Sequence, residues 1–148
     1  MQGLAVMIHH TVDPVAVCPL CSEKMATAHP ILQDWFERIR AAFPGAHVSW
    51  AFRDEETQEL FFREGKSRAR WPNSRHNRTP AEAIDLFLLG PDNVARWPKP
   101  WFLKISEWLI EKRAPIIWGG TFSSISDQDH FSLKASLCTS LGPGPVHC

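Results

Sequence analysis

Two stretches of the chain carry side chains that could together hold a catalytic metal ion. In the first, His76 and Asp85 lie nine positions apart, and in the second Asp127 precedes His130 by three positions. Asp85 is the single charge in the apolar run 83–89, where an ionised carboxylate is costly unless it is paired, hydrogen-bonded or bound to a metal. Two imidazoles and a carboxylate that leave a fourth position open form a ligand set typical of catalytic zinc.

A zinc ion held in this way would support hydrolysis of an amide bond. The metal lowers the pKa of its bound water to about 7 and polarises the carbonyl group under attack. A nearby carboxylate then takes the proton of the water and passes it to the leaving amine. Alternatives stay open at this point. Both histidines could be ordinary surface or core residues, Asp85 could pair with an arginine such as Arg53, Asp127 could cap a turn, and Arg53 could be a solvated charge at a strand end.

The spacing of apolar residues predicts the elements that must position these side chains. Apolar residues recur at helical spacing from Pro30 to Phe43, and an alternating pattern from His47 delivers Arg53 to the end of a strand. Asp54 suits the N-cap of the next helix. The expected helices are 30–43, 55–64 and 101–113, the expected strands are 47–53, 83–89, 116–118 and 130–133, and 66–80 is expected to be a polar loop.

Helices and strands are intermixed without regular alternation, so the sequence favours the α+β class. The 148 residues are enough for one domain with a single core. We expect a catalytic domain over 29–134, preceded by an irregular N-terminal arm over 1–28 and followed by a weakly ordered tail over 135–148.

Four blocks of sequence resemble the VanY-like zinc peptidases, which include D-alanyl-D-alanine carboxypeptidases and phage L-alanyl-D-glutamate endopeptidases. The resemblance implies a Hedgehog/DD-peptidase-like zinc peptidase fold, with a small antiparallel sheet and flanking helices. The blocks are Phe52-Arg53 with Gln58, Gly65-Lys66-Ser67, Ser74-x-His76 through Ala83-Ile84-Asp85, and Trp118-Gly119-Gly120 through Asp127-x-x-His130-Phe131.

The resemblance also implies a role for each matching residue. His76, Asp85 and His130 would be the ligands of one catalytic zinc ion, and Asp127 would be the general base. Arg53 would hold a substrate carboxylate or the developing oxyanion, since its guanidinium group suits bidentate binding of paired oxygens.

Supporting roles in the substrate pocket fall to Gln58, Ser74 and Trp118. For Trp118, as for Trp101 and Trp108, a place in the core is favoured over a sugar-binding surface.

Two departures from the family pattern concern this site. Many members place the histidine and aspartate ligands seven positions apart, whereas here the separation is nine, with the extra residues around Pro80 in an expected loop. Asp129 competes with Asp127 as the base, but the three-residue offset from His130 favours Asp127. A base that is aspartate rather than glutamate resembles the phage endopeptidase branch more than the carboxypeptidase branch.

The four cysteines are too sparse for an extracellular disulfide scaffold, so we expect reduced thiols. Cys18 and Cys21 form half of a zinc-knuckle pattern, and no second Cys-x-x-Cys completes it. An inert pair of thiols is therefore favoured over a second, structural zinc ion. The partners considered for such an ion are Cys138, Cys148, His29 and His147.

The amino-acid composition limits the classes of binding partner. Sixteen basic and sixteen acidic residues cancel, which gives no overall reason to expect nucleic acid or an anionic membrane. The basic stretch 66–78 could attract the anionic cell wall or could be a solvated loop.

No apolar run approaches the length of a membrane span, and the first such run lacks the basic flank of a signal peptide. We expect a monomer in the host cytoplasm that reaches the wall after the membrane is permeabilised.

These observations favour a zinc metallopeptidase that hydrolyses an amide bond in the stem peptides of bacterial peptidoglycan. A phage-type L-alanyl-D-glutamate endopeptidase, or endolysin, is the leading interpretation. One alternative is a D-alanyl-D-alanine carboxypeptidase. The other is a zinc-binding phage structural or wall-binding module without catalysis.

Overall fold

An antiparallel sheet organises the chain in the computed structural model, which describes residues 10, 18–121 and 127–134. Within those residues the sheet has five strands in the order β1-β2-β5-β4, and β3 pairs with β2. The expected α+β class, with a small antiparallel sheet and flanking helices, is confirmed. The strands are β1 (Ala46–Trp50), β2 (Ala83–Leu89), β3 (Ala95–Arg96), β4 (Ile116–Trp118) and β5 (His130–Leu133).

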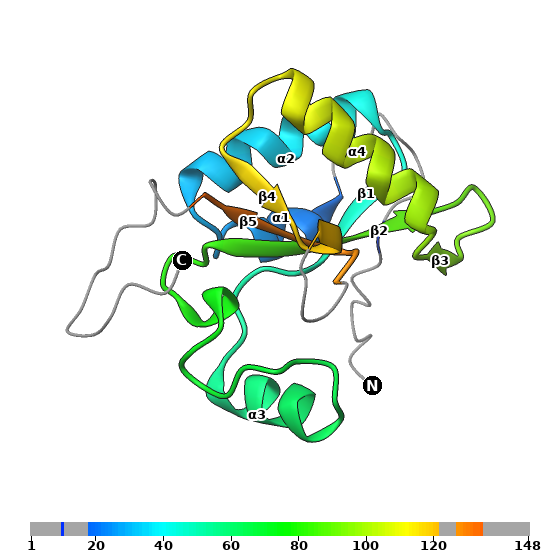
Figure 1. The fold of residues 1–148 in the computed structure, drawn as a ribbon. Coiled ribbons are helices and arrows are strands. Elements are labelled where there is room, and N and C mark those ends of the chain that lie inside the picture. Colours follow the sequence, from blue (N-terminus) through cyan, green and yellow to red (C-terminus); the bar gives the residue numbers. More distant parts are fainter. Residues whose placement is uncertain (1–9, 11–17, 122–126, 135–148) are drawn as a thin grey trace, which may run out of the picture.

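Helices cover the sheet unequally on its two sides. In Figure 1, α2 and α4 lie above the sheet, while α3 stands off its lower side. The α-helices are α1 (Pro19–Met25), α2 (Pro30–Ala42), α3 (Glu55–Arg63) and α4 (Lys99–Glu111), and the short 3-10 helices are η1 (Arg75–Asn77) and η2 (Gly119–Thr121).

The hydrophobic core fills the space between the sheet and the pair α2 and α4. Phe102 and Ile105 of α4 are fully buried, as are Leu32 of α2 and Phe131 of β5. Each fully buried large apolar side chain contributes about 1.5–3 kcal/mol relative to exposure. This side of the sheet therefore holds the fold together, and the opposite side is left for polar side chains.

Strand register places the candidate ligands on that opposite side. Asp85 of β2 lies directly opposite His130 of β5, whereas the neighbouring Ile84 lies opposite Phe131 in the core. Side chains directly opposite each other in an antiparallel pair point to the same face of the sheet. Asp85 and His130 therefore share the face that looks away from α2 and α4.

The sequence-predicted elements are largely confirmed, although β3 and the short helix η1 were not expected and three further features differ. The arm expected to be irregular contains α1, because Pro19 occupies the first turn and the Cys18 sulfur accepts a hydrogen bond from the Cys21 amide. The first strand ends at Trp50 rather than at Arg53, after a register shift between Val48 and Trp50.

The helix expected to reach residue 113 ends instead at Glu111, because Arg113 adopts a left-handed conformation with φ of 56°.

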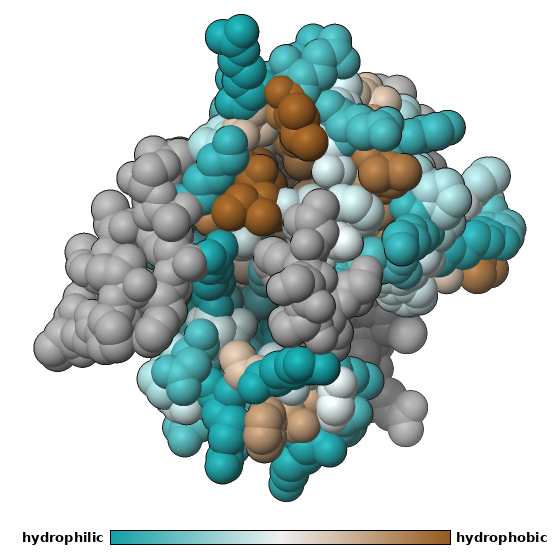
Figure 2. All heavy atoms as spheres, in the orientation of Figure 1, coloured by the Kyte–Doolittle hydropathy of each residue, from teal (hydrophilic) through white to brown (hydrophobic). Residues whose placement is uncertain are grey.

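Exposed apolar residues form separate spots among hydrophilic ones on the face shown in Figure 2. The exposed large apolar residues of the described chain include Leu103 and Ile110 on α4 and Leu60 on α3. No helix among the described residues combines the length and the apolar character that a membrane span requires.

Candidate metal centre

Three side chains from distant parts of the chain meet at the sheet face opposite the core. His76 Nε2 lies 3.1 Å from Asp85 Oδ1 and 3.2 Å from His130 Nδ1, and His130 Nδ1 lies 3.3 Å from Asp85 Oδ1. Tetrahedral zinc with nitrogen and oxygen ligands at 2.0–2.1 Å separates its ligand atoms by about 3.3 Å. The three donor atoms therefore have the mutual spacing of zinc ligands, with one corner of the tetrahedron left for solvent.

Local structure fixes the orientation of each ligand. His76 lies in η1, whose N-cap Ser74 accepts a hydrogen bond from the His76 amide through its Oγ. Its ring donates from Nδ1 to the carbonyl oxygen of Ala51 at 2.7 Å, which leaves Nε2 to face Asp85. A backbone carbonyl that holds the second ring nitrogen is a common support for a metal-binding histidine.

Burial and neighbouring charges set the protonation of these groups. Burial by itself would raise the pKa of Asp85, but the charges of His76 and His130 and their hydrogen bonds outweigh it and lower the pKa below its ordinary value. Burial lowers the pKa of His76. The site thus keeps the Asp85 carboxylate ionised, which is the form that binds a metal.

Arg53 occupies the other oxygen of the same carboxylate. The guanidinium Nη2 of Arg53 lies 3.1 Å from Asp85 Oδ2, and its Nη1 donates to Gln58 Oε1 at 3.2 Å. The ion pair with Arg53, which the sequence left as an alternative to metal binding, therefore coexists with the two histidines, because Asp85 uses Oδ1 for the histidines and Oδ2 for the arginine. Asn77 holds the same region by donating to the Arg53 carbonyl and to Gln58.

Asp127 stands at the open edge of the cluster. Its side chain is 40% exposed, and Oδ2 lies 3.9 Å from His130 Nδ1. The segment is held by the Asp127 amide, which donates to the Gly119 carbonyl, and a Cβ added at Gly119 would lie 2.4 Å from the Asp127 carbonyl oxygen. Glycine at 119 therefore allows the close backbone approach that keeps Asp127 beside the histidine.

Asp129 differs from Asp127 in its environment. Burial raises the pKa of Asp129 to about 9, and the charge of Asp85 and a hydrogen bond with Asp127 act in the same direction. At neutral pH this carboxyl group is protonated and can share its proton with Asp127.

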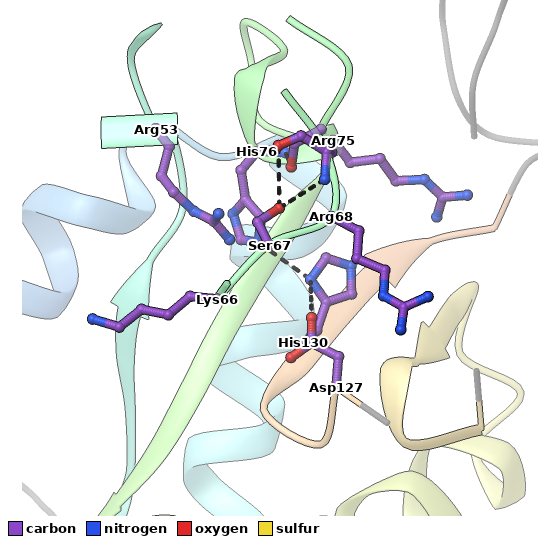
Figure 3. Close-up of a pocket in the computed structure, with 10 residues that line it drawn as sticks. Arg53, Lys66, Ser67, Arg68, Arg75, His76, Asp127 and His130 are labelled. Carbon is purple, nitrogen blue, oxygen red and sulfur yellow. Dashed lines mark hydrogen bonds and ion pairs between the residues drawn. The ribbon is translucent and has the colours of Figure 1, made fainter. Parts of the chain in front are cut away.

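Two adjoining cavities of about 300 and 400 Å³ open onto this cluster, and both are lined by Arg53, Lys66 and Asp127. Figure 3 shows His76 and His130 facing one another with Asp127 beside His130, while Lys66 and Arg68 extend to either side. The smaller cavity has a basic rim formed by Lys66, Arg68 and Arg75, which would attract carboxylate groups of a ligand.

Other predicted site residues have different positions. Ser74 lines the smaller cavity. Gln58 is fully buried behind Arg53 and donates to Ser67 Oγ and to the Ala69 carbonyl. Trp118 lies in the core and not among the lining residues, and its indole donates to the Gln128 carbonyl at 2.6 Å, next to Asp127.

Sequence reasoning missed Asn77 and the individual basic residues of the rim. The spacing of Ser74 and Asn77, which form a capping box around η1, was a signal for Asn77. For Lys66, Arg68 and Arg75 the signal was the run of unbalanced positive charge in 66–78.

Comparison with known proteins defines the fold. No family model matches the sequence, and no curated protein matches it. Among solved structures, the chain is similar to the crystal structure of the L-Ala D-Glu endopeptidase ChiX of Serratia marcescens, with a TM-score of 0.65. The two share 20% sequence identity over 90% of this chain and 96% of that chain. The chain therefore has the fold of a known endopeptidase along most of its length.

Proposed function

We propose that this chain is a zinc-dependent peptidase that hydrolyses an amide bond in peptidoglycan stem peptides, and specifically the bond between L-Ala and D-Glu. The observation that carries the proposal is the meeting of His76, Asp85 and His130 at zinc-ligand spacing, with Asp127 at the open edge. The fold shared with ChiX supports the choice of substrate.

The donor set fits one zinc ion, which would be held by His76 Nε2, Asp85 Oδ1 and His130 Nδ1. When bound, zinc supplies a Lewis acid that makes water more acidic and the scissile carbonyl more electrophilic. Arg53 keeps the second oxygen of Asp85 paired, so that the carboxylate stays ionised.

Asp127 carries the proton in the proposed reaction. Its Oδ2 accepts a proton from the attacking water as the water oxygen bonds to the carbonyl carbon. The same oxygen then gives the proton to the amide nitrogen as the carbon–nitrogen bond breaks, so the products are a carboxylic acid and an amine. Lys66 and Arg68 at the rim would hold the carboxylate groups of the stem peptide.

A phage-type lysin is the form of this activity that we propose. Such an enzyme would accumulate in the host cytoplasm and reach the wall once the membrane is permeabilised. Substrate affinity would come in part from the basic residues Lys66 and Arg68 that line the smaller cavity.

Digestion of purified sacculi followed by mass spectrometry tests the proposal. The L-Ala D-Glu endopeptidase creates new N-terminal D-Glu ends, whereas a D-alanyl-D-alanine carboxypeptidase releases free D-Ala. A wall-binding module gives no product at all.

The variant Asp127→Asn should retain zinc, and its rate of hydrolysis should fall by about 10²–10⁴-fold, which is the usual contribution of a general base. The matched control is Asp34→Asn on α2, where the exposed carboxylate pairs only with Arg38 among the ion pairs of the described residues. The control should hydrolyse sacculi at the wild-type rate. Unchanged turnover in Asp127→Asn would remove Asp127 from the mechanism, and release of D-Ala alone would replace the endopeptidase with the carboxypeptidase.

A further inference from the structure

A second group of metal-ligating side chains lies apart from the candidate catalytic site. His10 Nδ1 lies 3.2 Å from Cys18 Sγ and 3.3 Å from Cys21 Sγ, and His47 Nδ1 lies 3.2 Å from His10 Nδ1 and 3.3 Å from Cys21 Sγ. All four atoms lie within 4.8 Å of one another. Four other residues were possible partners for these cysteines on the sequence alone. One of them, His29, caps α2 instead. The remaining three, Cys138, His147 and Cys148, lie outside the described residues.

Hydrogen bonding alone does not account for this convergence. A ring nitrogen of neutral histidine carries either one proton or one lone pair, so it directs one hydrogen bond along one line. His10 Nδ1 instead lies at 3.2 to 3.3 Å from three polar atoms, which belong to Cys18, Cys21 and His47. Two ring nitrogens and two soft sulfur atoms within 4.8 Å of one another are the arrangement of ligands around an ion.

The distances match those of tetrahedral zinc. With zinc–nitrogen bonds of 2.0–2.1 Å and zinc–sulfur bonds of 2.3 Å, the expected nitrogen–nitrogen separation is about 3.3 Å and the nitrogen–sulfur separation about 3.5 Å. The observed separations are 3.2 Å between His10 and His47 and 3.2 to 3.3 Å between nitrogen and sulfur. The cluster is therefore already close to the size of a zinc coordination shell.

We propose that His10, Cys18, Cys21 and His47 bind a second zinc ion in a Cys2His2 site with a structural role. Four protein ligands fill a tetrahedral shell and leave no corner for water, which distinguishes structural from catalytic zinc. Thiolate and imidazole ligands select zinc over hard cations such as magnesium or calcium. Cys18, Cys21 and His47 are each at most 2% exposed, so the ion would be shielded from solvent by the protein.

Surrounding groups support the site. Phe87 of β2 stacks on His47 with ring centroids 5.7 Å apart and meets His10 edge-on at 5.0 Å, which restricts both rings. Burial lowers the pKa of His10 and of His47 to about 4, so both rings are neutral at pH 7. Neutral imidazole is the form that donates a lone pair to a metal.

The proposed ion would join three parts of the fold. Cys18 and Cys21 belong to the first turn of α1, His47 belongs to β1, and His10 lies in the segment before α1. Because β1 pairs with β2, which carries Asp85, the ion would fasten the N-terminal segment to the strand next to the catalytic ligands. Its role is to hold α1 on the sheet, as a disulfide does in secreted domains.

Metal analysis and zinc X-ray absorption of the purified full chain test this proposal. We expect two zinc ions per chain, and a zinc–sulfur shell at about 2.3 Å that averages one sulfur per zinc, since the catalytic site contains no sulfur ligand. In His130→Ala, which removes a ligand of the catalytic ion, the metal content should fall to one zinc and the average should rise to two sulfurs per zinc.

The variant Cys21→Ala should retain one zinc and lose the sulfur shell, whereas the matched control Cys138→Ala should keep both ions. If Cys21→Ala does not fold, the wild-type and His130→Ala spectra decide the question by themselves. A wild-type spectrum without zinc–sulfur scattering overturns the proposal. So does a peptide map in which Cys18 and Cys21 are joined by a disulfide.

Discussion

Replacing Arg53 with leucine tests whether the buried carboxylate of Asp85 requires a positive charge on each of its oxygens. The change removes the ion pair to Asp85 Oδ2 at 3.1 Å and the hydrogen bond to Gln58 at 3.2 Å. Removing one partner of a buried ion pair costs about 3–5 kcal/mol, because the remaining charge is left without compensation. Since Oδ1 keeps its contacts with His76 and His130, we expect the lower end of that range in the metal-free protein.

A loss of this size is large enough to measure in a chain of 148 residues. At about 2–4 °C per kcal/mol, a loss of about 3 kcal/mol lowers the Tm by roughly 6–12 °C. With zinc bound, the charge of the ion compensates Asp85 instead. The loss should then shrink to about 1 kcal/mol, which is the net value of the hydrogen bond to Gln58.

Urea unfolding of the wild type and of Arg53→Leu, with saturating zinc and with a chelator, measures this difference. Any second metal is gained or lost equally by both proteins, so it cancels in the comparison. The control Arg63→Leu changes an exposed arginine at the end of α3 and should shift stability by less than about 0.5 kcal/mol. An Arg53→Leu loss that is equal with and without zinc would refute the proposed sharing of Asp85 between the arginine and the metal.

Three further predictions concern the proposed catalytic base and the histidines His10 and His47. Gly119→Ala should lower hydrolysis, because the new Cβ would displace the Asp127 carbonyl and press on the Cβ of His130; sacculus digestion checks this. Asp129→Asn should keep most of the hydrolysis, since burial already holds this carboxyl group in its protonated form. With metals chelated, stability measured by urea unfolding should fall as the pH drops from about 6.5 toward 4. Burial lowers the pKa of the histidines His10 and His47 to about 4, so the unfolded chain binds protons there that the folded chain does not.

Each of these has an outcome that contradicts it. Wild-type turnover in Gly119→Ala would mean that the position of Asp127 is not set by this contact. Abolished hydrolysis with retained zinc in Asp129→Asn would make Asp129 the base. If the stability of the metal-free protein rises as the pH drops from 6.5 to 4, His10 and His47 are protonated in the folded state.

The sequence predicted best what is decided locally. The helix beginning at Pro30 and the strand over 83–89 follow from the spacing of apolar side chains, and the structure confirms both. The single charge of Asp85 within that strand pointed to a site for the same reason, because burial of an unpaired carboxylate is costly. Such signals lie within one element and do not depend on contacts with distant segments.

Features that depend on contacts between distant segments could not be read in this way. The shift in register near Ser49 shortens β1 relative to the alternating pattern, and β3 has only two residues, too few to show any period. Of the two histidines beside the Cys18 and Cys21 sulfurs, His47 is 26 positions from Cys21 in the chain, and nothing in the local spacing pairs them. Only the packing of α1 against β1 brings these groups together.

The rim of the cavity and the metal ligands come from different parts of the chain. Lys66 and Arg68 belong to the loop after α3, whereas Asp85 and His130 belong to the sheet. Lys66 and Arg68 could therefore be exchanged, in evolution or by loop grafting, without replacing a metal ligand, whereas Ser67 and Ala69 of the same loop hold Gln58 behind Arg53. In the proposed peptidase, the specificity for the peptide and the rate of its hydrolysis would then vary independently. One fold could thus be adapted to cell walls of different chemistry.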